Sequence, residues 1–265
     1  MKKLIACAWL LMALQSYGQQ VLSKEEYTPL FNGENWDGWY LKIRSGDPEE
    51  ANRVFAIEDG MIHVFKNHPD SFNLNQGNNK THGLFYTEKK YSMYSFRFEY
   101  KWGDKIMNNF DQFQYDAGLY YHVYNDKIWP FGLEYQIRYD HTKNENHTGD
   151  YWASTVQMQW YADENGRAAL PKNGGVTQEI KGGEHLAKIP KVHHALDGEW
   201  NQCEVIVMAD QYSIHKLNGE IVNYATDFDQ KEGVIGLQSE TAEIYYRNLE
   251  IREFDQFVPA NQFFK

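Results

Sequence analysis

Short segments in which polar and apolar residues strictly alternate recur along this chain, and they constrain its fold more than any other feature. Ser95–Trp102 is the clearest, because aromatic side chains at every second position are separated by Arg97, Glu99 and Lys101. A period of two places successive side chains on opposite faces of a β-strand. The sequence has neither a long segment with the 3.6-residue period of an amphipathic helix nor an internal repeat. We therefore expect an all-β protein.

Turn signals separate these segments. Asn218-Gly219 is typical of a type I′ hairpin, and Glu58-Asp59-Gly60 also predicts a hairpin turn. Strands are expected at Trp36–Tyr40, Phe55–Ile57, Met61–Phe65, Gly83–Thr87, Ser95–Trp102, Ala117–Tyr124, Leu133–Tyr139, Ser154–Trp160, Glu199–Met208, Gln211–Leu217, Glu220–Thr226, Gly233–Gln238 and Ala242–Glu253. The polar stretch Asn67–Thr81 and the Gly- and Lys-rich stretch Asn165–Ala195 are expected to be long loops. Many short strands joined by turns predict a sandwich of two sheets, and no shift in composition marks a second domain.

Two of these strands, Ala117–Tyr124 and Leu133–Tyr139, carry an unusual set of polar side chains. A loop containing Trp129-Pro130 joins them, so we expect them to pair as antiparallel neighbours. Alternation then gives them a shared polar face made of Tyr120, His122, Tyr124, Glu134, Gln136 and Arg138. A solvated sheet face usually carries Lys, Glu, Thr and Ser. A phenol, an imidazole, a carboxylate, an amide and a guanidinium side by side indicate a site for a polyhydroxylated ligand.

The N-terminus has the features of a secretory signal peptide. Two lysines precede the apolar run Leu4–Leu14, and Ser16 and Gly18 are the small residues of a cleavage site after Gly18. The run is too short for a permanent transmembrane helix. A lipoprotein would use Cys7, but too few residues precede it to form an apolar signal region. We therefore expect a secreted or periplasmic protein with a signal peptide at residues 1–18 and one jelly-roll domain at residues 19–265.

Charge and composition narrow the partners. Loss of the two N-terminal lysines would change the net charge from −11 to −13, whereas binding of nucleic acid requires a basic surface. No stretch after the signal is apolar enough to span a membrane. Cys203 is the one cysteine left after cleavage, so no intrachain disulfide is expected, and its apolar strand predicts a buried side chain. The aromatic content of 16% suits both sheets and contacts with carbohydrate.

Six short motifs follow one another in a recognisable order. They are Leu30-Phe31-Asn32-Gly33 with Trp39, Glu134-x-Gln136, Gly198-Glu199-Trp200-Asn201, His215-x-Leu217-Asn218-Gly219, Leu237-Gln238-Ser239-Glu240 and Tyr246-Arg247-Asn248. Together they resemble the secreted DUF1080 family, described as 3-keto-glucoside 1,2-lyase / 3-keto-2-hydroxy-glucal hydratase and formerly as 3-keto-disaccharide hydrolase. The resemblance covers Thr28–Phe254. It implies a concanavalin A-like jelly roll of two curved antiparallel sheets, with a sugar site on the concave face.

The resemblance also implies a reaction at a 3-keto sugar. The ketone makes C2–H acidic, because the resulting carbanion is held as an enolate. A base removes this proton, the C1–O bond breaks with help from an acid, and donors near O3 stabilise the enolate. Hydration of the resulting 2-hydroxy-glucal reverses these steps with water. The sequence has no Rossmann fingerprint or phosphate loop, so the oxidation that makes the 3-keto sugar must occur elsewhere.

The residues expected to carry this chemistry come from the shared polar face and its neighbours. Glu134 is the first candidate for base or acid, although it could instead pair with a cation across the sheet. His122 is the second candidate proton carrier, or a metal ligand, or a structural histidine, and it stands near where many family members have arginine. Arg97 and Glu99 are expected to orient Glu134, and Arg97 also to bind the enolate oxygen. The full set of candidate substrate-binding residues is Gln136, Arg97, Glu99, Arg138, Tyr120, Tyr124, Trp129, Gln238 and Glu240.

Cofactor and mechanism remain open at this stage. No metal-binding motif is present, but a divalent metal ion at the ketone would be chemically sensible, and the loop Asp140–Asp150 could hold calcium. Ordinary glycoside hydrolysis is an alternative that needs two carboxylates, with Glu240 or Glu99 as the partner of Glu134. A non-catalytic carbohydrate-binding module is another alternative. It would need the aromatic residues and Gln136, but no titrating carboxyl group.

Overall fold

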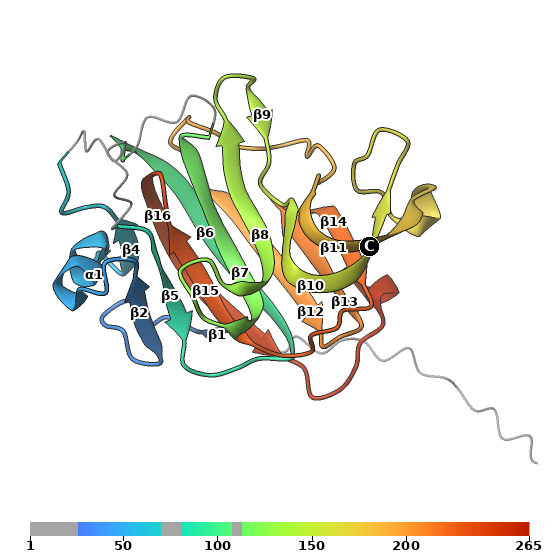
Figure 1. The fold of residues 1–265 in the computed structure, drawn as a ribbon, viewed down its shortest axis with the longest axis horizontal. Coiled ribbons are helices and arrows are strands. Elements are labelled where there is room, and N and C mark those ends of the chain that lie inside the picture. Colours follow the sequence, from blue (N-terminus) through green and yellow to red (C-terminus); the bar gives the residue numbers. More distant parts are fainter. Residues whose placement is uncertain (1–25, 70–80, 108–112, 265) are drawn as a thin grey trace, which may run out of the picture.

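The computed structural model describes residues 26–69, 81–107 and 113–264, and it is built almost entirely of strands (Figure 1). The strands are β1 Thr28–Pro29, β2 Trp39–Ile43, β3 Phe55–Glu58, β4 Met61–Val64, β5 Gly83–Thr87, β6 Met93–Ile106, β7 Tyr115–Asn125, β8 Phe131–Asp140, β9 Glu145–Asn146, β10 Tyr151–Ala162, β11 Val176–His185, β12 Asn201–Met208, β13 Tyr212–Leu217, β14 Glu220–Thr226, β15 Val234–Ser239 and β16 Ala242–Glu253. The helices are α1 Pro48–Val54 and the 3₁₀ turns η1 Pro171–Asn173 and η2 Ala260–Gln262. None of the helices in these ranges is long and apolar enough to cross a bilayer. The expected signal peptide lies outside the described residues.

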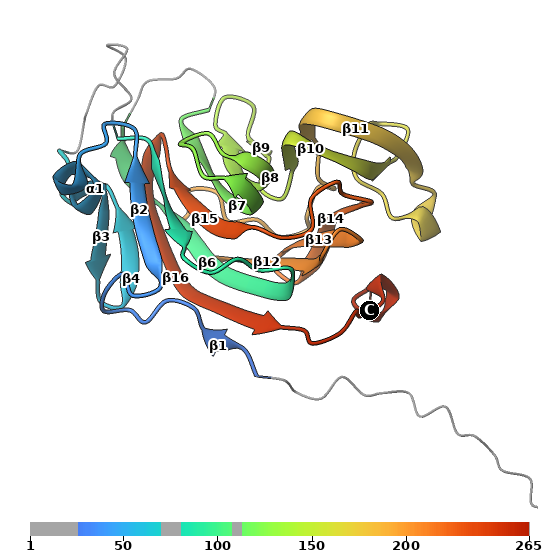
Figure 2. The same cartoon turned by 60° about the horizontal axis from the view of Figure 1, so that its bottom comes forward.

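The strands form two curved layers that face each other (Figure 2). The first layer has the order β2-β5-β15-β7-β8-β10, and the second has the order β14-β13-β12-β6-β16-β4-β3. The remaining strands β1, β9 and β11 pair with β16, β8 and β10. Neighbouring strands are antiparallel in both layers. This arrangement confirms the expected all-β jelly roll.

Strand β10 joins the two layers into one continuous sheet. Its N-terminal half pairs with β8, and Trp160 further along pairs with Ala225 of β14. Between these two halves, Ser154 and Thr155 both lie opposite Gly132, and Thr155 has a φ of 73°. Such a bulge inserts one residue and bends the strand. The bend carries β10 from the first layer into the second.

Buried hydroxyl groups connect the two layers across the apolar core. The hydroxyls of Tyr121 and Tyr151, in the first layer, each lie 2.8 Å from Ser213 Oγ in β13. Tyr121 also hydrogen-bonds Nε2 of His215, and Nδ1 of His215 donates to the carbonyl oxygen of Gly149 at 3.0 Å. Burial lowers the pKa of His215 to about 3, so its ring is neutral at neutral pH. Because these buried polar atoms are paired, they fix how the layers face each other.

Most of the expected strands are confirmed to within a few residues. The central strands do pair as β7 and β8, and Asn218 and Gly219 have φ values of 48° and 81°, the positive values that a type I′ turn requires. Cys203 is fully buried, as expected. The expectation of a loop over Asn165–Ala195 is wrong in part, because β11 lies within it. This strand lacks clear alternation and contains Gly182-Gly183, and its pairing with β10 forms it.

Candidate functional site

A row of side chains crosses the outer face of the first layer. In the sheet register, Tyr120 of β7 lies opposite Glu134 of β8. Trp152 of β10 lies opposite Glu134 on one side and Glu184 of β11 on the other. Tyr121, the neighbour of Tyr120, points into the core instead. Trp152 is 39% exposed, so an accessible indole lies between two carboxyl groups. An exposed ring beside hydrogen-bonding groups suits the apolar and polar faces of a sugar.

Glu134 is the most perturbed acid of this row. Its side chain is 3% exposed and passes over Gly118, where a Cβ atom would lie 2.7 Å from its Cδ and 2.9 Å from its Cγ. The Tyr120 hydroxyl donates a hydrogen bond to its carboxylate. Burial outweighs this bond and, together with the negative charge of Asp116, raises the pKa of Glu134 from 4.5 to about 8. A carboxyl group with such a pKa can take up and release a proton near neutral pH.

A hydrogen-bonded chain links Glu134 to the neighbouring strands. The Gln136 amide takes the orientation in which both of its polar atoms have partners. Its nitrogen donates to Glu134 Oε1 at 3.2 Å, and its oxygen accepts from Nη2 of Arg138. Arg138 Nε donates to Asp116 Oδ2 at 3.1 Å, and its Nη1 donates to Glu184 Oε1 at 2.7 Å. The guanidinium therefore ties β7, β8 and β11 together. Burial raises the pKa of Asp116 to about 6, although Arg138 opposes this shift.

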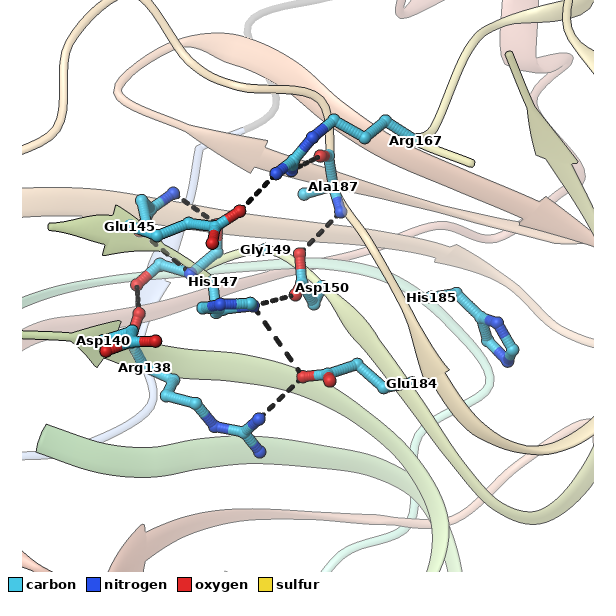
Figure 3. Close-up of polar contacts among 12 residues, drawn as sticks. Arg138, Asp140, Glu145, His147, Gly149, Asp150, Arg167, Glu184, His185 and Ala187 are labelled. Atoms are coloured by element: carbon cyan, nitrogen blue, oxygen red, sulfur yellow. Dashed lines mark hydrogen bonds and ion pairs between the residues drawn. The ribbon is translucent and has the colours of Figure 1, made fainter. Parts of the chain in front are cut away.

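Figure 3 shows Glu184, His147 and Asp150 converging beside Arg138. His147 Nδ1 lies 2.9 Å from Asp150 Oδ2 and 3.9 Å from Glu184 Oε1. Asp150 Oδ1 accepts a hydrogen bond from the backbone N–H of Ala187 at 2.5 Å. Burial raises the pKa of Asp150, and His147 opposes this shift. The three donor atoms lie within 4.8 Å of one another, and this is the group of described residues that could hold a metal ion.

Gln238 in β15 and Glu240 just after this strand add an amide and a further carboxyl group to the site, since β15 pairs with β7. Gln238 is 2% exposed, and its Oε1 has no hydrogen-bond partner within the described parts of the chain. Glu240 is partly exposed. Its carboxyl group is nevertheless desolvated, and this desolvation, with the negative charges of Asp116 and Glu134, raises its pKa well above the ordinary value. The structure thus brings together the expected residues Glu134, Gln136, Arg138, Tyr120, Gln238 and Glu240.

The expected aromatic residues lie further out. Trp129 is 48% exposed and stacks on the buried ring of His82, with ring centroids 4.9 Å apart. His82 in turn makes a hydrogen bond to the backbone of Glu240, which places Trp129 at the edge of the acidic cluster. Tyr124 is also 48% exposed, and its hydroxyl hydrogen-bonds Thr155 of β10.

The structure does not bring His122 to this cluster. The pairing of β7 with β8 becomes irregular after Tyr121, and His122 has a φ of 51°. Its ring is fully buried against Phe228, and its Nε2 lies 2.9 Å from the carbonyl oxygen of Ala209. Burial lowers its pKa to about 4. The expectation that His122 shares a face with Glu134 is wrong, because the irregularity breaks the alternation on which it depended.

Arg97 and Glu99 also lie elsewhere. Strand β6 belongs to the second layer, where it pairs with β12 and β16. Arg97 Nε donates to Glu250 Oε2 at 2.6 Å, and Glu99 Oε2 accepts from Arg247 Nε at 2.7 Å. The expectation that these two residues orient Glu134 or bind the enolate is wrong. Alternation identified the polar face of β6 correctly, but it could not tell which strands lie next to β6.

Several residues of the cluster were not predicted as site residues. They are Asp116, His147, Asp150, Trp152 and Glu184. Trp152 was missed because β10 begins at Tyr151, three residues before the expected strand, and Glu184 was missed because it lies in the unexpected β11. In the loop Asp140–Asp150, considered for calcium, Asp140 instead accepts hydrogen bonds from backbone N–H groups of the following turn.

Comparison with known proteins agrees with this fold. Residues 26–252 match the model of the 3-keto-alpha-glucoside-1,2-lyase-like domain. A "putative glycosyl hydrolase" from Parabacteroides distasonis ATCC 8503 is 21% identical in sequence, with a TM-score of 0.52 over 86% of this chain and 94% of that one. A second structure with the same description and source is 18% identical, with a TM-score of 0.52 over 86% of this chain and 100% of that one. At these identities the two structures show a shared fold. The search of curated proteins gave no significant match.

The jelly-roll fold and the matched family place this chain among proteins whose function is related to carbohydrates. The chain belongs to the 3-keto-alpha-glucoside-1,2-lyase-like domain family, whose model spans most of its length.

Proposed function

We propose that this protein is a carbohydrate-active enzyme that cleaves 3-keto-glycosides by elimination, or hydrates the 2-hydroxy-glucal that elimination produces. The observation that carries the proposal is the buried carboxyl group of Glu134. Its pKa of about 8 matches a group that moves protons at neutral pH, and it lies beside the exposed ring of Trp152. A solvated structural carboxylate would have neither property.

Glu134 is assigned as the base. Its ionised carboxylate removes the proton from C2, and the C2–H electrons form an enolate with the 3-ketone. As the enolate collapses, the C1–C2 double bond forms and the C1–O bond breaks, so the aglycone leaves with the glycosidic oxygen. The proton held by Glu134 is then returned to this oxygen. In the hydration reaction, water adds at C1 and a proton at C2, and the same carboxyl group serves both steps.

Neighbouring side chains position the sugar and the base. Tyr120 and Gln136 both donate to the Glu134 carboxylate, which holds the carboxylate over Gly118. Arg138 supplies positive charge where the enolate would form, replacing the role first expected of Arg97. Trp152 offers a face on which the pyranose ring can stack.

Hydrolysis and simple binding are the competing functions. Glu240 interacts electrostatically with Glu134, so a second carboxyl group is available for hydrolysis, whereas Glu99 lies in the second layer. The exposed rings of Trp129 and Trp152 would also serve a binding module. A binding module needs no carboxyl group that titrates near neutral pH, so Glu134 favours an enzyme. Hydrolysis also uses a carboxyl group with a raised pKa, as its general acid, and the two reactions are therefore separated by their products.

The test is NMR of the protein with a 3-keto-glucoside in D₂O. Elimination should give a 2-hydroxy-glucal. Hydration of this glucal should place deuterium at C2 of the resulting 3-keto-glucose, because C2 is reprotonated from solvent. Formation of 3-keto-glucose without deuterium at C2 would instead establish hydrolysis. Binding of the glycoside without any turnover would establish a binding module.

The assignment of Glu134 as base predicts the pH dependence of kcat/KM. Only the ionised form of the base is active, and its pKa is raised to about 8. Activity should therefore rise roughly tenfold per pH unit below this value and level off above it. The measurement is kcat/KM between pH 5.5 and 9.5 with a substrate that does not titrate in this range. A profile that falls with rising pH through 8 would make Glu134 the acid rather than the base.

A further inference from the structure

His147, Asp150 and Glu184 bring three metal-binding groups to one point on the edge of the acidic cluster. One ligand atom from each residue lies within 4.8 Å of the other two. Nδ1 of His147 lies 2.9 Å from Asp150 Oδ2 and 3.9 Å from Glu184 Oε1 (Figure 3). Ligand atoms around a first-row metal at about 2.1 Å are separated by about 3–4 Å. We propose that these three residues bind a divalent metal ion.

The donor set favours a particular class of ion. One imidazole nitrogen and two carboxylate oxygens suit Mn²⁺ or Zn²⁺, which accept mixed nitrogen and oxygen ligands. Ca²⁺ and Mg²⁺ prefer oxygen ligands alone and are disfavoured by the imidazole. The three protein ligands leave coordination positions for water or for a ligand, as in metal sites that take part in catalysis.

The groups around the three residues hold them in place without a metal. Asp150 Oδ1 accepts from the Ala187 backbone, which leaves Oδ2 directed toward the site. The backbone N–H of His147 donates to the carbonyl oxygen of Arg138 at 3.0 Å, and the Arg138 side chain holds Glu184 at 2.7 Å. Outer contacts of this kind orient ligands and increase metal affinity. The site is therefore preorganised by the loop between β9 and β10, which carries His147 and Asp150, and by the end of β11, which carries Glu184.

Charge provides an independent argument for a cation. Asp116, Glu134, Asp150, Glu184 and Glu240 interact with one another electrostatically. Among the largest electrostatic contributions to these groups, those of opposite sign come from Arg138 and His147. The carboxyl groups outnumber these two cations. Crowded buried carboxylates are stabilised either by protons or by a bound cation, and a divalent ion would neutralise two of them at once.

The chain contains a natural comparison for this site. His194 Nδ1 also lies 2.9 Å from a carboxylate oxygen three residues along the chain, that of Asp197. This pair is more exposed than His147 and Asp150, and no third metal-binding side chain of the described residues joins it. A histidine–aspartate pair alone therefore does not define the proposed site. What distinguishes the proposed site is the third ligand, Glu184, and the greater burial of His147 and Asp150.

The metal would have a role in the reaction if the proposed function is right. Glu184 flanks Trp152 on the side opposite Glu134, so the ion would lie next to the proposed sugar-binding row. There it could bind a sugar oxygen and stabilise negative charge on it. This role rests on the proposed function, whereas metal binding itself does not.

The experiment measures metal binding in the absence of any substrate. The protein is stripped with a chelator, and binding of Mn²⁺ is followed by electron paramagnetic resonance and by calorimetry, with Zn²⁺, Mg²⁺ and Ca²⁺ for comparison. We expect one Mn²⁺ per chain. Glu184→Gln keeps an oxygen for Arg138 but removes the charged ligand, and it should raise the Kd by more than the 10–100-fold typical of outer contacts. His194→Asn should leave the Kd unchanged.

Two outcomes would overturn the proposal. One is the absence of saturable binding of any of the four ions at millimolar concentration by the folded wild-type protein. The other is binding that Glu184→Gln and Asp150→Asn leave intact, with circular dichroism showing that both variants are folded. If Mn²⁺ binds as expected but no 3-keto-glycoside is turned over, the metal site stands and the proposed function fails.

Discussion

Glu134→Gln should reduce kcat for a 3-keto-glycoside by about 10²–10⁴-fold, because loss of a general base removes acceleration of that size. Glutamine has nearly the same shape and still accepts the hydrogen bond from the Tyr120 hydroxyl, so the protein should fold and bind substrate with little change in Kd. The measurement is single-turnover kinetics together with a separate binding titration. A loss of affinity in place of a loss of kcat would show that Glu134 binds the sugar rather than reacts with it.

Glu99→Gln is the matched control for this experiment. Glu99 also lies on a regular strand and was among the candidate substrate-binding residues, but it pairs with Arg247 on the outer face of the second layer. Its substitution should leave kcat unchanged. Equal losses of kcat in the two variants would contradict the placement of the active site at Glu134 on the first layer. A loss of kcat below about tenfold in Glu134→Gln would show that Glu134 is not the base.

The contrast between these two glutamates shows what the sequence could specify. Alternation correctly predicted which residues of β6, of β8 and of β7 up to Tyr121 face away from the core, because the period of a strand is a local property. It also predicted that β7 and β8 are neighbours, since the loop between them is short. The order of strands in a sheet depends on contacts between distant segments. No local sequence pattern could therefore predict that β6 lies in the second layer or that β15 pairs with β7.

The two largest errors at the site have local physical causes. His122 left the polar face because one irregularity in β7 reversed the alternation, and the sequence around it gives no glycine or proline as a warning. Glu184 was missed because β11 lacks the alternation of a strand that covers a core, and its pairing with β10 supplies the order instead. By contrast, Glu134 was found because β8 alternates regularly, with Leu133, Tyr135 and Ile137 in the core, and because its pairing with Tyr120 precedes the irregularity in β7.

Gly118→Ala should reduce kcat about 100-fold although Gly118 touches no substrate, because a displacement of the catalytic group by about 1 Å can cost this much. The new Cβ would lie 2.7 Å from Cδ and 2.9 Å from Cγ of Glu134, so the carboxyl group must move. Gly118 does not have a positive φ, and alanine therefore suits its backbone. The moved carboxyl group would be better solvated, so the pH profile of kcat/KM should also shift to lower pH.

Gly103→Ala provides the same steric change away from the site. Its Cβ would lie 2.5 Å from Cγ and 2.6 Å from Cδ of Glu243, a carboxylate that His63 and the backbone of β6 hold at the far side of the second layer. Both variants should lose some thermal stability, but only Gly118→Ala should lose kcat and shift the pH profile. If Gly118→Ala keeps its kcat and pH profile, the position of the Glu134 carboxyl group over Gly118 is not what the reaction requires. If both variants lose activity equally, the effect reflects the fold and not the base.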